Sequence, residues 1–273
     1  MIENKHGSTN GFASISWGPV MWFLIHLYSF QADLYFFRTW FESLPRVLPC
    51  GACRENLPRN LIQSNYDPKI WTSRDMVSQY MWQLHNVVNQ CLGKVGPFPP
   101  YEHVRSYFLG IRYTASTHIR IQGYDTLGLP SVYTCMRALS RPWWFVCIVV
   151  LLNFPLVSNK EMCTVHVNWI MDGISSIPSH CEKRLLKRHF LQVHDHYRQK
   201  WADRTQITRA DMIELLMSFI RLVYKQKVLD VRDILITHER LRASRCTTSN
   251  GSREGSCIGV SNAPCRIICE SHP

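Results

Sequence analysis

The sequence lacks an apolar run long enough to span a membrane. Its longest uncharged stretch, from Pro142 to Asn159, has a dense apolar centre but is interrupted by Asn153 and Pro155. A spanning helix needs about 20 largely apolar residues, so this stretch predicts a buried core helix instead. Residues 1–10 are polar and have no apolar centre, which argues against a secretory signal. Together these absences favour a cytosolic protein.

Acidic residues are scarce relative to basic ones. There are 20 Asp and Glu against 31 Lys and Arg, which gives a formal net charge of +11. The basic residues are scattered over expected helix faces, as at 184–188 and 198–209, and form no tail. This distribution is typical of a solvated surface rather than of a nucleic-acid site. One alternative stays open: a non-enzymatic helical binding module that docks a protein or nucleic acid through this basic surface.

Strand-like alternation is also rare, and 117–122 is the one tempting stretch. Helical spacing recurs along the chain and predicts an all-α protein. Residues 12–110 are expected to form a four-helix bundle with a short fifth helix. A linker at 111–130, a second, mainly helical domain at 131–243 and a flexible tail at 244–273 are expected to follow. The expected helices cover Trp17–Phe37 (capped by Ser16), Thr39–Val47, Cys50–Ser64, Ser73–Leu92, Tyr101–Leu109, Val132–Asn153, Ser179–Ala202, Thr208–Lys225 and Val231–Arg242.

The 11 cysteines are unusual for a cytosolic chain, where structural disulfides are rare. Cys50 and Cys53 form a C-x-x-C pair at an expected helix start, where the helix N-terminus and Arg54 would stabilise a thiolate. A zinc site would need two further ligands at matching spacing, and no second C-x-x-C or H-x3–5-H follows within reach. A redox disulfide is therefore favoured, with zinc and an inert structural pair as the alternatives.

A polar stripe lies on one of the expected helices. His85 and Asn89 are four residues apart and share a face, and Trp82 lies one turn before His85. Asn86 and Lys94 add an amide and an ammonium group. Buried polar groups need partners, so a bound heteroaromatic molecule explains this stripe better than a plain core does. The hypothesis is a flat cofactor that receives electrons from the thiol pair.

Three motifs follow one another along the chain: Trp17-Gly-Pro-x-x-Trp22-x-x-x-His26, Pro49-Cys50-x-x-Cys53, and His85-Asn86-x-Val88-Asn89-x-x-Leu92-Gly93-Lys94. In this order they resemble the Erv/ALR family of FAD-linked sulfhydryl oxidases over residues 12–110. The Trp-Gly-Pro form resembles the versions of large DNA viruses most. The helical region after it resembles, more weakly, the extra domain of mimivirus-type enzymes. Such a protein would act in the host cytoplasm or in a virion.

The resemblance implies a helical bundle that holds FAD beside the Cys50–Cys53 disulfide. A substrate dithiol would attack Cys50, expected to be the more accessible sulfur, and Cys53 would pass two electrons to the flavin. Oxygen would then be reduced to hydrogen peroxide. The implied partners are thiol-containing proteins, with a thioredoxin-like carrier or virion proteins among them, and O2. The residues that the resemblance places at FAD are Trp22, His26, Trp82, His85, Asn86, Asn89 and Lys94, with Trp17, Tyr101 and Tyr107 as weaker candidates.

The sequence departs from the family pattern in three places. Many members carry Tyr-Pro where Phe30-Gln31-Ala32-Asp33 stands, and many carry a cysteine just before His-Asn. Shuttle cysteines normally relay electrons to the redox pair, and none precedes Cys50 here. A shuttle in the tail is one hypothesis, with a tail of free thiols and a zinc knuckle using His272 as alternatives. The tail cysteines are Cys246, Cys257, Cys265 and Cys269.

The other cysteines and a histidine cluster are expected to play no chemical part. Cys135, Cys147, Cys163 and Cys181 lie in or near apolar segments and are expected to be buried thiols. His189, His194 and His196 are not joined by carboxylates, so no metal site is expected.

An aromatic-rich stretch suggests a partner surface. It consists of Phe36, Phe37, Trp40 and Phe41, which is more than one small bundle core readily absorbs. Members of the family that the chain resembles commonly pair through their first helices. A homodimer is therefore expected.

Overall fold

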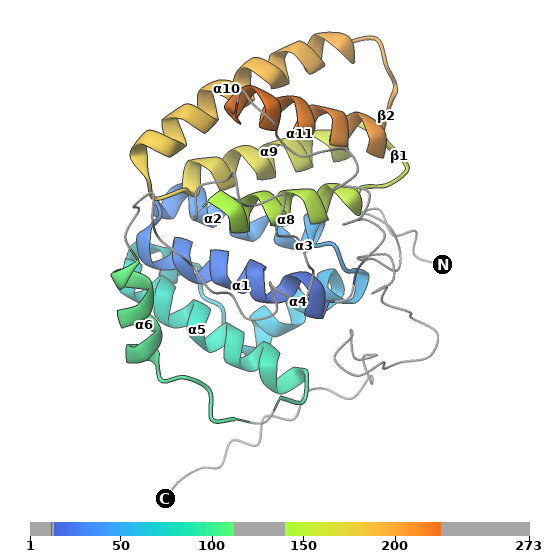
Figure 1. The fold of residues 1–273 in the computed structure, drawn as a ribbon. Coiled ribbons are helices and arrows are strands. Elements are labelled where there is room, and N and C mark those ends of the chain that lie inside the picture. Colours follow the sequence, from blue (N-terminus) through green and yellow to red (C-terminus); the bar gives the residue numbers. More distant parts are fainter. Residues whose placement is uncertain (1–11, 13, 95, 112–139, 225–273) are drawn as a thin grey trace, which may run out of the picture.

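The computed structural model describes residues 12, 14–94, 96–111 and 140–224, and within them the chain is almost entirely helical, as the sequence predicts (Figure 1). In the N-terminal bundle, α1 packs against α5 and α6, and α4 packs against α5. The elements of this bundle are α1 (Ser14–Gln31), α2 (Leu34–Glu42), α3 (Leu44–Val47), α4 (Gly51–Gln63), the 3-10 helix η1 (Pro68–Thr72), α5 (Arg74–Cys91) and α6 (Tyr101–Gly110).

The first helix has different ends from those that the sequence predicts. It already includes Ser16, the expected cap, and it ends at Gln31 rather than at Phe37. The break arises at Asp33, whose backbone is extended and whose Oδ1 accepts the Tyr35 N–H at 2.9 Å. A side-chain acceptor of this kind caps a new helix, so α2 begins directly after it.

The predictions for α4, α5 and α6 are confirmed to within two residues at each end. Cys50 caps α4, and Ser73 precedes α5. Gly93, with a φ of 70°, lies just beyond the end of α5. This left-handed conformation commonly terminates helices, and glycine adopts it without steric cost.

The C-terminal region adds a second layer of helices. Its elements are α8 (Ser140–Leu152), β1 (Val157–Asn159), α9 (Lys160–Ser176), α10 (His180–Lys200), β2 (Gln206–Thr208) and α11 (Arg209–Tyr224). The two strands pair antiparallel, with Val157 opposite Thr208. The sequence predicts α8, α10 and α11 but misses α9 and both strands. Asn159 was a usable sequence signal for the start of α9, because asparagine commonly caps helix N-termini. In the structure its side chain does so by accepting the Met162 N–H at 2.9 Å.

The apolar stretch after Pro142 is confirmed as a core helix. Trp143 and residues 146–152 are buried in α8. In the part of the chain that the structure describes, no helix combines the length and the apolar character that a membrane crossing requires.

The two layers share one hydrophobic core. α9 packs along α2, and α8 packs along α1, so the C-terminal helices cover one side of the N-terminal bundle (Figure 1). Trp40 of α2 stacks on Trp169 of α9 with the ring centroids 5.8 Å apart. The Tyr28 hydroxyl of α1 donates to the Gly173 carbonyl of α9 at 3.2 Å. The C-terminal region is therefore part of what holds the N-terminal bundle in place.

This packing accounts for the aromatic-rich stretch without a second protomer. Phe37, Trp40 and Phe41 are between 0% and 2% exposed. The rings of Phe37 and Phe41 contact Trp71 of η1, and Trp40 contacts α9. The aromatic side chains on which the dimer prediction rests are thus buried within one chain. Any homodimer would have to use another face.

Several predictions fall outside the described residues. They are the strand-like stretch 117–122, almost all of the linker, the helix Val231–Arg242 and the tail with its cysteines.

Candidate functional site

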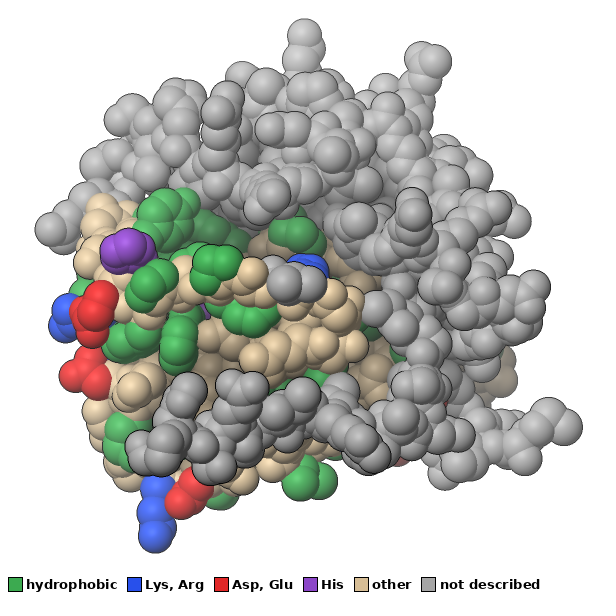
Figure 2. Space-filling model, turned by 90° about the horizontal axis from the view of Figure 1, so that it is seen from below, with side chains coloured by type: hydrophobic (Ala, Val, Ile, Leu, Met, Phe, Trp, Pro, Cys, Tyr) green, Lys and Arg blue, Asp and Glu red, His purple; other side chains and the backbone are tan. Residues whose placement is uncertain are grey.

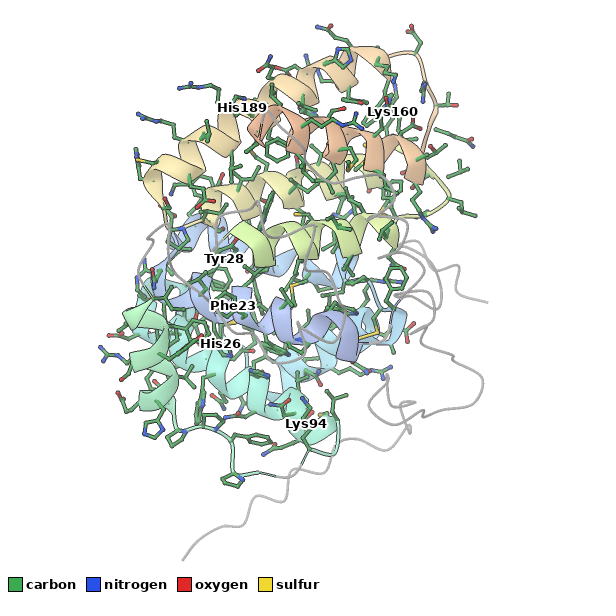
Figure 3. All side chains as sticks on the ribbon, viewed as in Figure 1. Phe23, His26, Tyr28, Lys94, Lys160 and His189 are labelled. Atoms are coloured by element: carbon green, nitrogen blue, oxygen red, sulfur yellow. A yellow bond between two sulfur atoms is a disulfide. The ribbon has the colours of Figure 1, made fainter. Side chains whose placement is uncertain are left out.

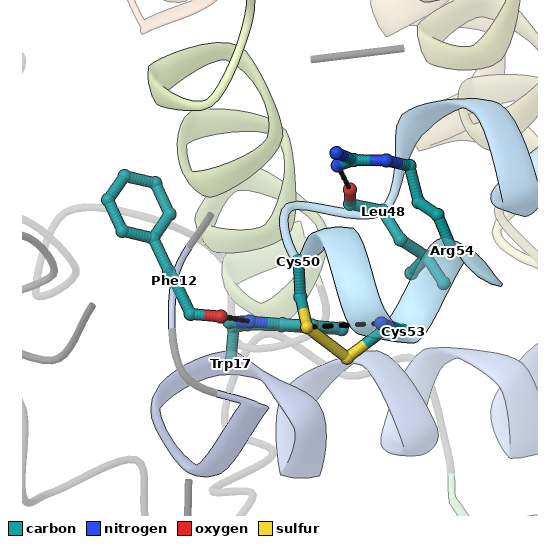
Figure 4. Close-up of a disulfide and its surroundings, with 6 residues drawn as sticks. All are labelled: Phe12, Trp17, Leu48, Cys50, Cys53 and Arg54. Carbon is teal, nitrogen blue, oxygen red and sulfur yellow. Dashed lines mark hydrogen bonds between the residues drawn. A yellow bond between two sulfur atoms is a disulfide. The ribbon is translucent and has the colours of Figure 1, made fainter. Parts of the chain in front are cut away.

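Cys50 and Cys53 form a disulfide at the N-terminus of α4 (Figure 4). Their Cα atoms are 5.2 Å apart, within the usual range for a disulfide. The backbone at Cys50 is extended, and its sulfur accepts the Cys53 N–H at 3.2 Å. Helix N-termini carry a partial positive charge from unpaired N–H groups, so a thiolate formed here is stabilised. The position suits thiol–disulfide exchange.

Arg54 adds a buried positive charge beside this pair. Its Nη1 donates to the Leu48 carbonyl at 2.5 Å, which ties α4 to the turn before Cys50 (Figure 4). Burial lowers the pKa of Arg54 to about 10, so the guanidinium remains charged at neutral pH.

The exposure of the two sulfurs differs from the expectation. Cys50 is 0% exposed and Cys53 is half-buried, so the prediction that Cys50 is the more accessible sulfur is wrong. The Phe12 N–H donates to the carbonyl of Pro49, the residue before Cys50, at 2.6 Å. The Phe12 carbonyl in turn accepts the Trp17 indole N–H at 3.1 Å. Trp17, a weaker cofactor candidate, is therefore linked through Phe12 to the backbone next to Cys50.

An aromatic and imidazole cluster lies between α1 and α5. The Trp22 ring stacks on His85, with the centroids 4.1 Å apart and the planes within 6°. His26 Nε2 lies 2.9 Å from His85 Nδ1, so one ring donates a hydrogen bond to the other. Trp22 and His26 are one turn apart on α1, and Figure 3 shows His26 between α1 and α5. The structure thus brings the first and third sequence motifs together.

Both imidazoles are neutral near pH 7. Burial lowers the pKa of His26 from 6.5 to about 4. Burial lowers the pKa of His85 to about 2, and the charges of His26 and Lys94 add to that shift. Neutral rings can stack on a flat ligand and bond to its edge without the cost of a buried cation.

We expect the cofactor-free protein to lose stability in acid through His26. Its folded pKa, about 4, lies below the 6.5 of the unfolded chain, so between these values the unfolded state binds more protons. The contribution is complete above pH 6.5 and is lost as the pH falls toward 4. Between pH 7 and pH 5, protonation linked to His26 should lower the free energy of unfolding by about 1–2 kcal/mol in urea titrations, and His85, whose pKa is lowered further, should add a decrease of similar size. His26→Gln should flatten this dependence and His103→Gln, at an exposed position on α6, should not; equal slopes would contradict the assignment.

Trp82 and Tyr101 meet at the loop that precedes α6. Their rings are 6.0 Å apart and edge-on. The Trp82 indole N–H donates to the Pro99 carbonyl at 2.8 Å, and the Tyr101 hydroxyl shares a 2.8 Å hydrogen bond with Ser78. These two predicted residues therefore fasten that loop to α5, one turn before His85.

Three predicted polar residues follow His85 along the chain. Asn86 is half-buried, Asn89 is buried, and Lys94 is exposed just beyond α5 (Figure 3). The Lys94 backbone N–H donates to the Asn89 carbonyl at 3.0 Å. The Lys94 charge still reaches the stack, because it contributes to the lowered pKa of His85. The stripe thus leads from the half-buried rings of Trp22 and His85 to an exposed cation.

Among the described residues, two buried polar atoms in this region have no hydrogen-bond partner: His26 Nδ1 and Asn89 Oδ1. An unsatisfied buried group costs about 1–3 kcal/mol. A heteroaromatic molecule with a phosphate offers a ring face for stacking, a polar edge for these two atoms and an anion for Lys94. The residues present therefore fit FAD.

Two further residues, Phe108 and Gln31, belong to this region and were not predicted from the sequence. Phe108 of α6 is buried, and its ring centroid lies 5.4 Å from that of His26. The Gln31 amide donates to the carbonyls of Phe108 and Ile111, which holds the end of α6 against α1. Gln31 stands where many family members carry Tyr-Pro. The seven-residue spacing of Tyr101 and Phe108 was a usable signal for a shared helix face.

The face formed by α5 and α6 exposes hydrophobic side chains. Figure 2, which views the molecule from that side, shows them gathered on this face with charged groups mainly toward its edge. Tyr107, a weaker cofactor candidate, is 49% exposed on α6, and Leu109 is 40% exposed.

Within the described residues, no group of three metal-ligating side chains occurs, and His189, His194 and His196 lie along α10. Cys147 and Cys163 are buried, as predicted. Cys181 is exposed, so the prediction of a buried thiol is wrong there. It lies in the first turn of α10, on the outer side of the helix.

Comparisons with known proteins agree with the order of the motifs. Residues 19–103 match the model of the Erv1 / Alr family. A protein of Acanthamoeba polyphaga mimivirus named a probable FAD-linked sulfhydryl oxidase is 31% identical over 85 residues, which are 29% of this chain and 59% of that relative. The chain therefore spans about three fifths of the length of that relative. No solved structure matches.

Proposed function

We propose, from the Erv1/Alr family domain at residues 19–103, that this chain is an FAD-dependent thiol oxidase that forms disulfides in protein substrates. The observation that carries the proposal is the placement of the Cys50–Cys53 disulfide in the same bundle as the Trp22–His85 stack. α4 packs on α5, and α5 packs on α1, so the thiols and the rings belong to one core. The working unit is proposed to be residues 12–110.

Electrons enter by thiol–disulfide exchange. A substrate thiolate attacks the Cys50 sulfur and forms a mixed disulfide, and Cys53 leaves as a thiolate. The second substrate thiol then attacks the mixed disulfide, which releases oxidised substrate and leaves both cysteines reduced. The N-terminus of α4 stabilises the Cys53 thiolate. The redox pair thereby holds the two electrons of one substrate dithiol.

A bound FAD would supply the chemistry that carries these two electrons on to O2, with hydrogen peroxide as the proposed product. The residues of the chain bind and orient it. Trp22 and His85 would offer ring faces for stacking, the unpaired atoms of His26 and Asn89 would offer hydrogen bonds, and Lys94 would offer a positive charge for a phosphate. Trp82, Asn86 and Tyr101 complete the site along α5 and the start of α6.

We expect the purified protein to be yellow, with the visible absorption bands of a flavin. His85→Ala removes a stacking partner worth about 1 kcal/mol, so FAD affinity should fall by roughly fivefold to tenfold. The measurement is the ratio of visible to protein absorbance during titration of the apo protein with FAD. The matched control is His103→Ala, which should titrate like the wild type. A folded, colourless protein that takes up no FAD would contradict the proposal and favour the binding-module alternative.

The immediate electron donor is a further part of the proposal. The tail cysteines Cys246, Cys257, Cys265 and Cys269 lie outside the described residues and are candidates for a shuttle. A thioredoxin-like carrier or a virion protein would instead present its dithiol directly. The host cytoplasm or a virion is the proposed location, and a homodimer through a face other than α2 is the proposed assembly.

A further inference from the structure

The burial of Cys50 conflicts with its proposed role unless part of the structure moves. Exchange requires that the attacking sulfur reach the disulfide sulfur, so the rate depends on access. Cys50 is 0% exposed. Cys53 is half-buried, but in the proposed function its sulfur faces the cofactor and not the substrate.

Phe12 and Trp17 form a small hydrogen-bonded pair next to Pro49 and Cys50, here called the N-terminal cover. The Phe12 N–H is bonded to Pro49, the residue directly before Cys50, and the Phe12 carbonyl accepts the Trp17 indole N–H. Phe12 and Trp17 are each 4% exposed. Figure 4 shows both on one side of the disulfide, with Leu48 and Arg54 on the other.

We propose that the N-terminal cover gates thiol access to Cys50 and so makes Phe12 and Trp17 specificity-determining residues. This inference rests on the proposed function and adds the substrate class. A small thiol such as glutathione offers nothing in exchange for the contacts that opening breaks. A protein segment in extended conformation can replace the Phe12 N–H at the Pro49 carbonyl while its own thiolate attacks Cys50. The preferred substrate is therefore a cysteine pair carried on an extended protein segment.

The test measures the access to each sulfur separately. In the full-length Cys53→Ser variant, Cys50 remains as a thiol. In the full-length Cys50→Ser variant, Cys53 remains as a thiol. Each is treated with iodoacetamide, and the alkylation rate of the remaining thiol is read from peptide masses. Trp17→Phe keeps the ring but removes one buried hydrogen bond, so Cys50 alkylation should rise on the order of fivefold. Phe12→Gly removes the buried ring and should raise it further, and neither change should alter the rate at Cys53.

The matched control is Trp71→Phe, which removes the indole hydrogen bond to the Tyr66 hydroxyl, 2.8 Å long, away from the disulfide. It should leave Cys50 alkylation unchanged, and circular dichroism verifies that every variant is folded. The proposal is overturned if Cys50 reacts as fast as Cys53 without any cover mutation, or if neither cover mutation exceeds the control. No flavin is needed for the readout, so a colourless protein would refute the proposed function without affecting this result.

Discussion

Replacing Cys53 with serine should lower the turnover of a dithiol substrate by on the order of a thousandfold or more, while FAD remains bound. The reason lies in the order of the steps. Without the Cys53 sulfur, Cys50 has no disulfide to be attacked, and no dithiol forms that can hold two electrons. Stacking on Trp22 and His85 does not depend on either sulfur, so the visible spectrum should be kept. Oxygen consumption with dithiothreitol measures turnover, and absorbance measures the bound flavin.

The matched control is Cys181→Ser, which removes an exposed thiol on α10. Because α10 lies in the C-terminal layer and makes no contact with the disulfide among those described, this variant should turn over at the wild-type rate. A Cys53→Ser protein that keeps more than about a tenth of the activity would show that another thiol pair supplies the electrons. Loss of the flavin together with activity would assign Cys53 a structural role.

The Cys50–Cys53 disulfide could be predicted from the sequence because its information is local, whereas the stacking of Trp22 on His85 was not predicted. C-x-x-C fixes the distance between two thiols, and helical spacing puts Trp22 with His26 and Trp82 with His85 on shared faces. What no spacing reveals is how segments far apart in sequence meet. Phe12, which lies before the first expected helix, is hydrogen-bonded to Pro49 beside the buried Cys50, and this bond runs to a backbone carbonyl that any residue would offer.

The helices show the same difference between features encoded locally and features set by tertiary contacts. α4, α5 and α6 begin and end near their predicted positions because caps and glycine mark their ends. α9 was missed because Asn168, Asp172 and Gly173 interrupt its apolar pattern. Gly173 in particular reads as a helix breaker, with a cost of about 1 kcal/mol relative to alanine. Glycine is needed at this position because of tertiary packing, since two tryptophan rings occupy the space where a side chain would lie.

The contact of α9 with α2 and α8 leaves no room at Gly173. A Cβ atom there would lie 2.5 Å from Trp143 Nε1 and 3.0 Å from Trp40 Nε1. Both tryptophans are 0% exposed, so neither ring can swing out toward solvent. The Gly173 carbonyl also accepts the Tyr28 hydroxyl, so a shift of α9 to relieve the clash would lengthen that bond.

Gly173→Ala should therefore destabilise the protein despite the better helix propensity of alanine. Overpacking against two fixed rings should cost about 3 kcal/mol, and helix propensity returns up to about 1 kcal/mol, for a net loss of about 2 kcal/mol in urea unfolding. The control is Gly18→Ala in α1, where the nearest atom to the new Cβ is Ser14 Cβ at 3.9 Å. That substitution gains propensity without a clash and should be neutral or slightly stabilising. Equal stability of the two variants would mean that α9 does not pack against Trp40 and Trp143, and hence that the aromatic face of α2 is free for a second protomer.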